Sequence, residues 1–151
     1  MKKNRSPANG TVFLVPLPSQ AFCPGVLVRA NGKGGAYGLF FSPPVSDAAS
    51  VDFSSLTPDR AILRCKFGDH GLHTGRWPVV GAIPEWNDDR WRLPRFFRPT
   101  DDRKNCYVTD YDDRLNIVSE VILPAGETRD MVENTQYGSG ILEVRLGKLL
   151  Q

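Results

Sequence analysis

Short apolar runs separated by turn residues dominate the chain, and this pattern predicts strands rather than long helices. The first three runs cover residues 11–17, 25–29 and 36–41. Asn31-Gly32 lies between the second and third runs, and an Asn-Gly step accommodates the positive φ angles of a tight hairpin. We therefore predict that these two strands pair antiparallel, with Pro16 near the end of the first strand.

Further runs predict strands over residues 61–67, 77–83, 106–110 and 117–123, with a loop over 45–60 and a short connector over 68–75. The C-terminal pattern is different. From Gly140 to Leu150 the leucines recur at helical spacing, which predicts an amphipathic helix. Ser139 is positioned to act as its N-cap, and Glu143 lies in the first turns, where negative charge is favoured.

These elements predict one domain over residues 10–151, preceded by a frayed polar terminus over 1–9. A chain of 151 residues can bury a hydrophobic core without disulfides or metals. The predicted fold class is α+β and mainly β: a small twisted antiparallel sheet or partly open barrel with a C-terminal amphipathic helix.

The three cysteines indicate a reducing compartment. Cys23, Cys65 and Cys106 are odd in number, widely spaced and without a CxxC pair, so we expect reduced, buried thiols. Pro16 and Pro18 interrupt the first apolar run, which makes it a poor signal peptide, and no run approaches the roughly 20 apolar residues of a membrane span. The sequence therefore predicts a cytoplasmic location.

Residues capable of catalysis or metal binding are present, but their spacing does not form a site. His70 and His73 form an H-x-x-H pair near Cys65, whereas zinc requires three or four ligands. Ser139 lies in a Gly-Ser-Gly sequence that lacks the spacing of a nucleophile elbow, and nothing places a histidine against Cys23 or Cys106. Lys33-Gly34-Gly35 lacks the order of a phosphate-binding loop. We expect no catalytic, cofactor or metal site.

Charge is distributed unevenly although the net charge is only +2. Residues 76–104 contain seven basic and five acidic residues, and residues 105–133 contain two basic and seven acidic residues, a net of −5. An acidic stretch can present its surface to a basic partner. The residues we expect to contact such a partner are Asp110, Tyr111, Asp112, Asp113 and Glu127.

The basic, aromatic stretch 86–98 supports an alternative function. Its tryptophans and phenylalanines could stack on bases while its arginines contact phosphates, as in a small β-barrel module that binds nucleic acid. Acidic residues are interleaved in this stretch, and tryptophans between prolines equally fit core positions. The stretch therefore gives nucleic-acid binding as a second hypothesis.

Several segments resemble the immunity protein 26 family of bacterial polymorphic toxin systems. They are N-G-T-V-F-L-V-P-L-P at 9–18, the strand at Gly25, T-G-R-W-P-V-V-G-A-I-P at 74–84 and L-P-R-F-F at 93–97, followed by a terminal helix with Glu143 and Leu146. The central block is the most specific of these. Residues 85–92 and 99–136 show no such resemblance.

The resemblance implies an immunity protein that binds a cognate toxin in the cytoplasm, with no catalytic residue and no cofactor. The toxin partner is expected to have a basic active-site surface, and no membrane partner is expected. The positions that recur in the family have the chemistry of core plugs and turn formers, so partner specificity is expected on exposed loops. These positions are Phe13, Pro16, Gly25, Trp77, Pro78, Gly81, Pro94 and Phe96.

Overall fold

The computed structural model describes residues 7–151 and contains two β-sheets of unequal size. The prediction of a frayed terminus over 1–9 falls mostly on residues outside this range. The larger sheet has the strand order β10-β4-β3-β2-β1-β5. Its strands are β1 (Thr11–Pro16), β2 (Phe22–Ala30), β3 (Gly35–Phe40), β4 (Leu63–Gly68), β5 (Val79–Ala82) and β10 (Gln136–Tyr137).

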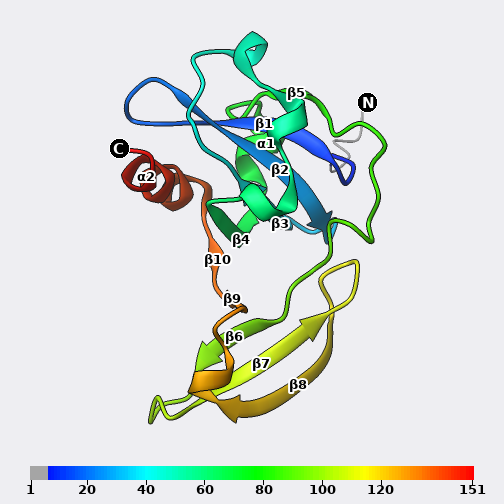
Figure 1. The fold of residues 1–151 in the computed structure, drawn as a ribbon, viewed down its shortest axis with the longest axis vertical. Helices are drawn as coiled ribbons and strands as arrows, with labels where there is room; N and C mark the ends of the chain where they lie inside the picture. The colour runs from blue at the N-terminus through cyan, green and yellow to red at the C-terminus, as the bar shows by residue number, and fades with distance from the viewer. Residues whose placement is uncertain (1–6) are drawn as a thin grey trace.

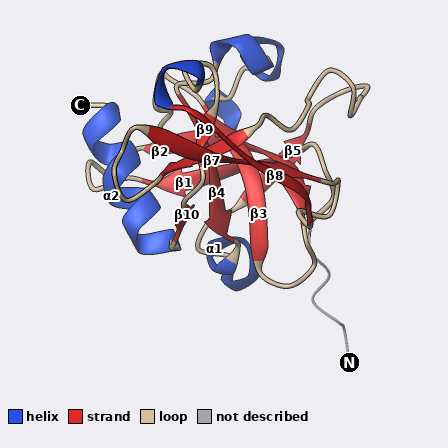
Figure 2. Cartoon of the chain, turned by 90° about the horizontal axis from the view of Figure 1, so that it is seen from below, coloured by secondary structure: helices blue, strands red, loops and turns tan. Residues whose placement is uncertain are grey.

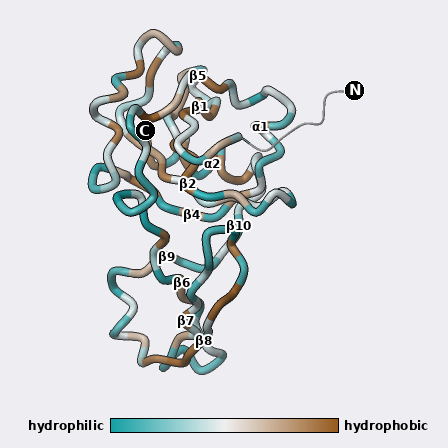
Figure 3. Tube along the Cα trace, turned by 90° about the vertical axis from the view of Figure 1, so that its right-hand side faces the viewer, coloured by the Kyte–Doolittle hydropathy of each residue, from teal (hydrophilic) through white to brown (hydrophobic). Residues whose placement is uncertain are grey.

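The smaller sheet lies at one end of the molecule, below the larger one in Figures 1 and 3, and has the order β8-β7-β6-β9. Its strands are β6 (Phe96–Pro99), β7 (Asn105–Tyr111), β8 (Ile117–Pro124) and β9 (Val132–Glu133). We call residues 95–133 the small lobe and the remaining described residues the large lobe. The chain enters the small lobe after β5 and leaves it between β9 and β10.

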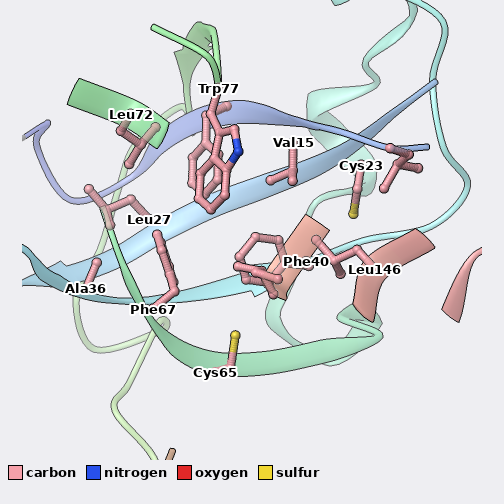
Figure 4. Packing of buried hydrophobic residues seen from close by; sticks show 13 residues of the cluster. Val15, Cys23, Leu27, Ala36, Phe40, Cys65, Phe67, Leu72, Trp77 and Leu146 are labelled. Atoms are coloured by element: carbon pink, nitrogen blue, oxygen red, sulfur yellow. The ribbon is translucent and has the colours of Figure 1, made fainter. Parts of the chain in front are cut away.

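Both faces of the larger sheet are covered. On one face, Phe13 of β1 stacks on Trp77 with ring centroids 5.9 Å apart and an interplanar angle of 4°. Figure 4 shows Trp77 packed in this core with Phe40, Phe67 and Leu146. The helices α1 (His70–Thr74) and α2 (Ser139–Leu149) contribute Leu72, Leu142 and Leu146 to the same cluster. Figure 2 shows α2 along one side of the sheets.

The opposite face of the larger sheet packs against loops and the small lobe. Val12, Leu14 and Val28 point to this side, where they join Trp91 of the connecting loop and Phe96 of β6. Three 3-10 helices over Ala48–Ser50, Phe53–Ser55 and Pro58–Arg60 lie in the loop between β3 and β4, and a fourth covers Ala125–Glu127. Because β1 is covered on both faces, it reads as a continuous apolar run instead of an alternating one.

The structure confirms the α+β, mainly β class and the antiparallel hairpin of β2 and β3. It divides the predicted sheet into two, and neither sheet is a closed barrel. The strand β6 was not predicted, because Pro94 and Pro99 made its segment look irregular. The two-residue strands β9 and β10 were also not predicted, and each pairs in parallel with a strand distant in sequence.

Two predictions about the terminal helix are wrong. Ser139 is already the first helical residue, and the N-cap is Gly138, which is extended (φ −68°, ψ 158°) and makes no side-chain cap. Glu143 does not act through the first turn, since its carboxylate is engaged with Arg76 and Trp77. No helix within residues 7–151 is long and apolar enough to cross a membrane.

Candidate functional site

The acidic residues predicted to contact a partner lie at the two ends of one hairpin in the small lobe. Asp110 and Tyr111 end β7, and Asp112 and Asp113 occupy the turn that leads into β8. Glu127 follows β8 in the 3-10 helix at its far end. The structure therefore brings the first four together and places Glu127 a full strand length away from them.

Asp110 and Asp112 both have structural partners. Asp110 accepts hydrogen bonds from Arg95 Nε (3.1 Å) and from the Ser119 hydroxyl (2.9 Å). Asp112 accepts the backbone N–H groups of Arg114 (2.9 Å) and Asn116 (3.0 Å), which close the turn. These bonds, led by the one from Asn116, lower the pKa of Asp112 below its ordinary value because they favour the charged carboxylate. Asp112 is therefore first of all a turn residue.

Asp113 belongs to an ion cluster centred on a buried arginine. Arg29 of β2 is almost fully buried, and its Nε donates to Asp113 at 3.0 Å. Its Nη1 lies 3.4 Å from the Asp88 carboxylate and also donates to the carbonyls of Val28 and Trp91. The guanidinium thus ties the hairpin turn and the 86–93 loop to the larger sheet. Sequence reasoning missed Arg29, although a lone arginine within the run G-V-L-V-R-A is a visible signal.

Tyr111 lies between the lobes and is not a free anchor. Its ring packs edge-on against Phe96 with centroids 5.2 Å apart. Its hydroxyl accepts from Lys66 Nζ at 3.0 Å and donates to Asn134 at 2.9 Å. The Lys66 ammonium also lies 4.7 Å from the centre of the Tyr111 ring. This half-buried residue therefore helps to fix the orientation of the small lobe.

The small lobe is acidic by formal charge. It contains six basic and nine acidic residues, a net charge of −3, while the large-lobe residues 7–94 and 134–151 have ten basic and eight acidic residues, a net of +2. The value is less extreme than the −5 of residues 105–133 because β6 places Arg95 and Arg98 beside β7. Arg95 pairs with Asp110, and Arg98 lies 3.9 Å from Glu120.

Most of the residues considered for catalysis are buried or hydrogen-bonded within the fold. All three cysteines are free and buried, and burial raises the pKa of Cys23 and of Cys65 to about 12, which makes them poor nucleophiles. His73 binds Asp69 at 3.0 Å within α1 and its N-cap, while His70 is exposed. No group of three or more potential metal ligands comes together within residues 7–151.

The aromatic side chains of the 86–98 stretch are largely buried. Trp91 and Phe96 are core residues, and Trp86 stacks on Trp91 with ring centroids 5.1 Å apart. Gly10 accommodates Trp86, because a Cβ on Gly10 would lie 2.9 Å from the indole. These rings pack within the protein and do not form an exposed stacking platform for nucleic acid.

Most of the positions of the sequence resemblance lie in or around the core. Phe13, Trp77 and Phe96 are fully buried. A Cβ on Gly25 would lie 2.8 Å from the Phe13 ring, and one on Gly81 would lie 2.9 Å from Phe53. The remaining members are at strand ends and turns: Pro16 ends β1, the Pro78 carbonyl accepts from Leu14 N at 3.0 Å, and Pro94 precedes β6.

Glu143 holds α2 on the larger sheet and was missed as a structural residue. Its carboxylate accepts from Arg76 Nη2 (2.6 Å), Arg76 Nε (2.8 Å) and Trp77 Nε1 (2.9 Å). The bonds from Arg76 are the main cause that lowers the pKa of Glu143, and they outweigh the opposing effect of burial. Its position between Leu142 and Leu146, on the buried face of the helix, is the signal that could have revealed this role.

A cleft of about 520 Å³ lies between β4, the segment before β9 and α2. Arg64, Arg129 and Arg145 line it together with Asp130 and Glu133. The cleft contains polar groups of both signs, together with the buried Cys65 thiol.

The largest feature that sequence reasoning missed is the exposure of β8. Its aliphatic side chains are exposed by 62% (Ile117), 62% (Val118), 42% (Val121) and 58% (Ile122). The run I-V-S-E-V-I-L is not alternating, so its sequence resembles a strand buried on both faces. That pattern led to a correct strand prediction and gave no warning that the strand lies at an edge.

Comparison with known proteins identifies a family. The family model for immunity protein 26 matches residues 8–107. No curated protein and no solved structure matched the chain. The matched range runs from the start of β1 into the first half of β7, and it leaves out β8 and α2.

Proposed function

The chain belongs to the immunity protein 26 family, and from this premise we propose that it binds a cognate bacterial toxin in the cytoplasm and neutralises it by protein–protein contact. The family match is the observation that carries the proposal. The site supports a role in binding, because Cys23 and Cys65 are buried with raised pKa values and His73 is paired with Asp69. The protein acts as a stoichiometric inhibitor without a reaction of its own.

The small lobe is the proposed contact surface for the toxin. Most of it lies beyond the matched residues 8–107, and a surface that fits one particular partner is expected outside the part shared by the family. Its net charge of −3 favours encounter with a positive surface, such as the active site of a toxin that attacks nucleic acid. Asp110, Tyr111, Asp112, Asp113 and Glu127 are the proposed contact residues.

Co-expression with the product of the adjacent upstream gene tests the proposal. We expect the protein to restore growth of cells that make this toxin and to co-purify with it in a stable complex. Matched cultures that express Trp77→Ala, which disrupts the core, serve as the control for a folded immunity protein. Growth arrest that the wild-type protein does not relieve, together with no co-purification, would contradict the proposal.

The acidic surface can be tested by removing charge without removing hydrogen-bond acceptors. The variant Asp110→Asn/Glu127→Gln leaves Asp112 in place because that residue closes the turn, and it leaves Asp113 in place because that residue pairs with the buried Arg29. We expect the association rate with the toxin to fall roughly 3- to 10-fold at low salt and to change little at high salt. The control Glu85→Gln/Asp89→Asn removes the same charge from the large lobe, and an equal effect of both variants would argue against a localised acidic contact.

A further inference from the structure

The strand β8 is an open edge of the small sheet and the longest edge strand in the described part of the chain. It has eight residues, whereas the other sheet edges, β9, β10 and β5, have two, two and four. An edge strand exposes unpaired backbone N–H and C=O groups that can pair with another strand. From this edge we propose that the toxin adds a β-strand to β8 and extends the small sheet.

Apolar side chains lie on both faces of β8, as they do on a strand that is covered on both faces. Val121 is opposite Val108, and Ile122 is opposite Tyr107, so the two neighbouring side chains point to opposite faces. Both are substantially exposed, as are Ile117 and Val118. A strand with one solvated face would normally alternate, and β8 thus has the composition of a strand that is covered on both faces.

Most of the usual protections of an edge strand lie at the ends of β8, and Glu120 is the one charged residue between them. Its pairing with β7 shifts from Asp110–Ser119 to Tyr111–Ile117, which leaves Val118 as the extra residue of a bulge, and Pro124 ends the strand. From Ser119 to Leu123 the strand is regular and contains no lysine, arginine or proline. Natural edges are commonly blocked by such residues, so this five-residue segment is open to pairing.

Charge indicates what kind of strand fits this edge. Glu120 lies in the middle of β8, Asp112 and Asp113 precede the strand, and Glu127 follows it. A toxin strand with apolar residues on both faces and a basic residue near Glu120 would complement this surface. A second copy of the chain is a poorer fit, because it would bring two lobes of net charge −3 together.

This inference rests on the proposed function and specifies the toxin segment that is bound. The variant Val118→Lys/Ile122→Lys places two cations at exposed positions of β8, where the fold itself loses little. We expect its Kd for the co-purified toxin to rise at least about 100-fold. The matched control Ile141→Lys/Val144→Lys makes the same kind of change at exposed positions of α2 and should bind like the wild type.

The outcomes separate the two proposals. A wild-type protein that does not bind the toxin removes the proposed function, and the strand pairing with it. A wild-type complex that survives Val118→Lys/Ile122→Lys unchanged overturns the strand pairing alone. A free wild-type protein that is dimeric in sedimentation, and that becomes monomeric in this variant only, assigns β8 to a second copy and also overturns the inference.

Two further measurements test the type of contact. Hydrogen exchange of the β8 amides should slow on toxin binding at alternate positions, because every second N–H of the strand faces away from β7. The variant Glu120→Gln keeps an acceptor for the Thr109 hydroxyl, which donates to Glu120 at 2.9 Å, and removes the charge. We expect it to bind the toxin roughly 10-fold more weakly, and unchanged affinity would exclude a basic residue opposite Glu120.

Discussion

The strands β1 and β8 are both apolar runs, T-V-F-L-V-P and I-V-S-E-V-I-L-P, but the first is buried in the fold and the second is exposed. β1 pairs with β2 and β5 and is buried on both faces, whereas β8 pairs only with β7 and is exposed on both. The comparison shows that an apolar pattern makes a segment suited to a buried strand but does not determine whether the rest of the chain covers that strand. The apolar side chains of β8 are left exposed, where another molecule can cover them.

The largest expected effect separates the two strands by their contribution to stability. Leu14→Ala in β1 should lower the free energy of unfolding by about 2–5 kcal/mol, because it leaves a cavity in a closed core. Ile122→Ala in β8 should change it by no more than about 0.5 kcal/mol. Urea unfolding followed by tryptophan fluorescence measures both, and comparable losses would mean that β8 is buried in solution.

Two glycines, Gly25 in the packed core and Gly126 in open space after β8, sharpen the comparison. Gly25→Ala would place a methyl group 2.8 Å from the Phe13 ring and 3.0 Å from the Phe40 ring. We expect a loss of about 1–3 kcal/mol from overpacking. Gly126→Ala, after β8, meets no atom within 4 Å and serves as the control with little change in stability. A tolerated Gly25→Ala would show that the core can relax around β2.

The reaction rates of the three buried thiols measure how easily each lobe opens locally. Cys106 is buried in the small lobe, and Cys23 and Cys65 are buried in the large lobe. Because β8 leaves the small lobe with an exposed sheet, we expect Cys106 to react with a thiol reagent about tenfold faster than the other two under native conditions, a difference of roughly 1.4 kcal/mol in opening. Single-cysteine variants identify each rate, and equal rates would indicate that the lobes open together.

The smallest effect concerns pH and the attachment of α2. The pKa of Glu143 is lowered in the folded state, so its charge stabilises the fold above the ordinary value of 4.5, and this stabilisation is lost as the pH falls through the lowered pKa. Glu143→Gln keeps an acceptor for Trp77 but weakens the pairing with Arg76. We expect a loss of about 1 kcal/mol at pH 7 that shrinks towards pH 3. Thermal unfolding across this range measures it, and a loss independent of pH would exclude the ion pair as its cause.

Local patterns predicted much of the fold. Asn31-Gly32 and the apolar runs beside it gave the β2–β3 hairpin, and the leucine spacing gave α2. The division into two sheets was not predictable, because it depends on the short parallel pairs of β9 and β10 with strands far away in sequence. Such pairings leave almost no trace in a two-residue segment.

The candidate site was predicted less well for an electrostatic reason. Counting charges along residues 105–133 located the acidic hairpin but could not show that Arg95 and Arg29 reach Asp110 and Asp113 from other strands. The exposure of β8 was equally hidden, since neighbours in a sheet are a property of topology. Family resemblance added the expected function, and its matched range ends within β7, before the open edge strand β8.

The buried guanidinium of Arg29 has a consequence for how such a protein can diversify. It holds the tip of the β7–β8 hairpin through one carboxylate, Asp113, while its other bonds go to main-chain carbonyls and Asp88. Main-chain acceptors do not depend on side-chain identity. At the tip of the hairpin this cation therefore constrains the identity of Asp113 alone, beside the turn-closing Asp112, and it sets no requirement on the exposed side chains of β8.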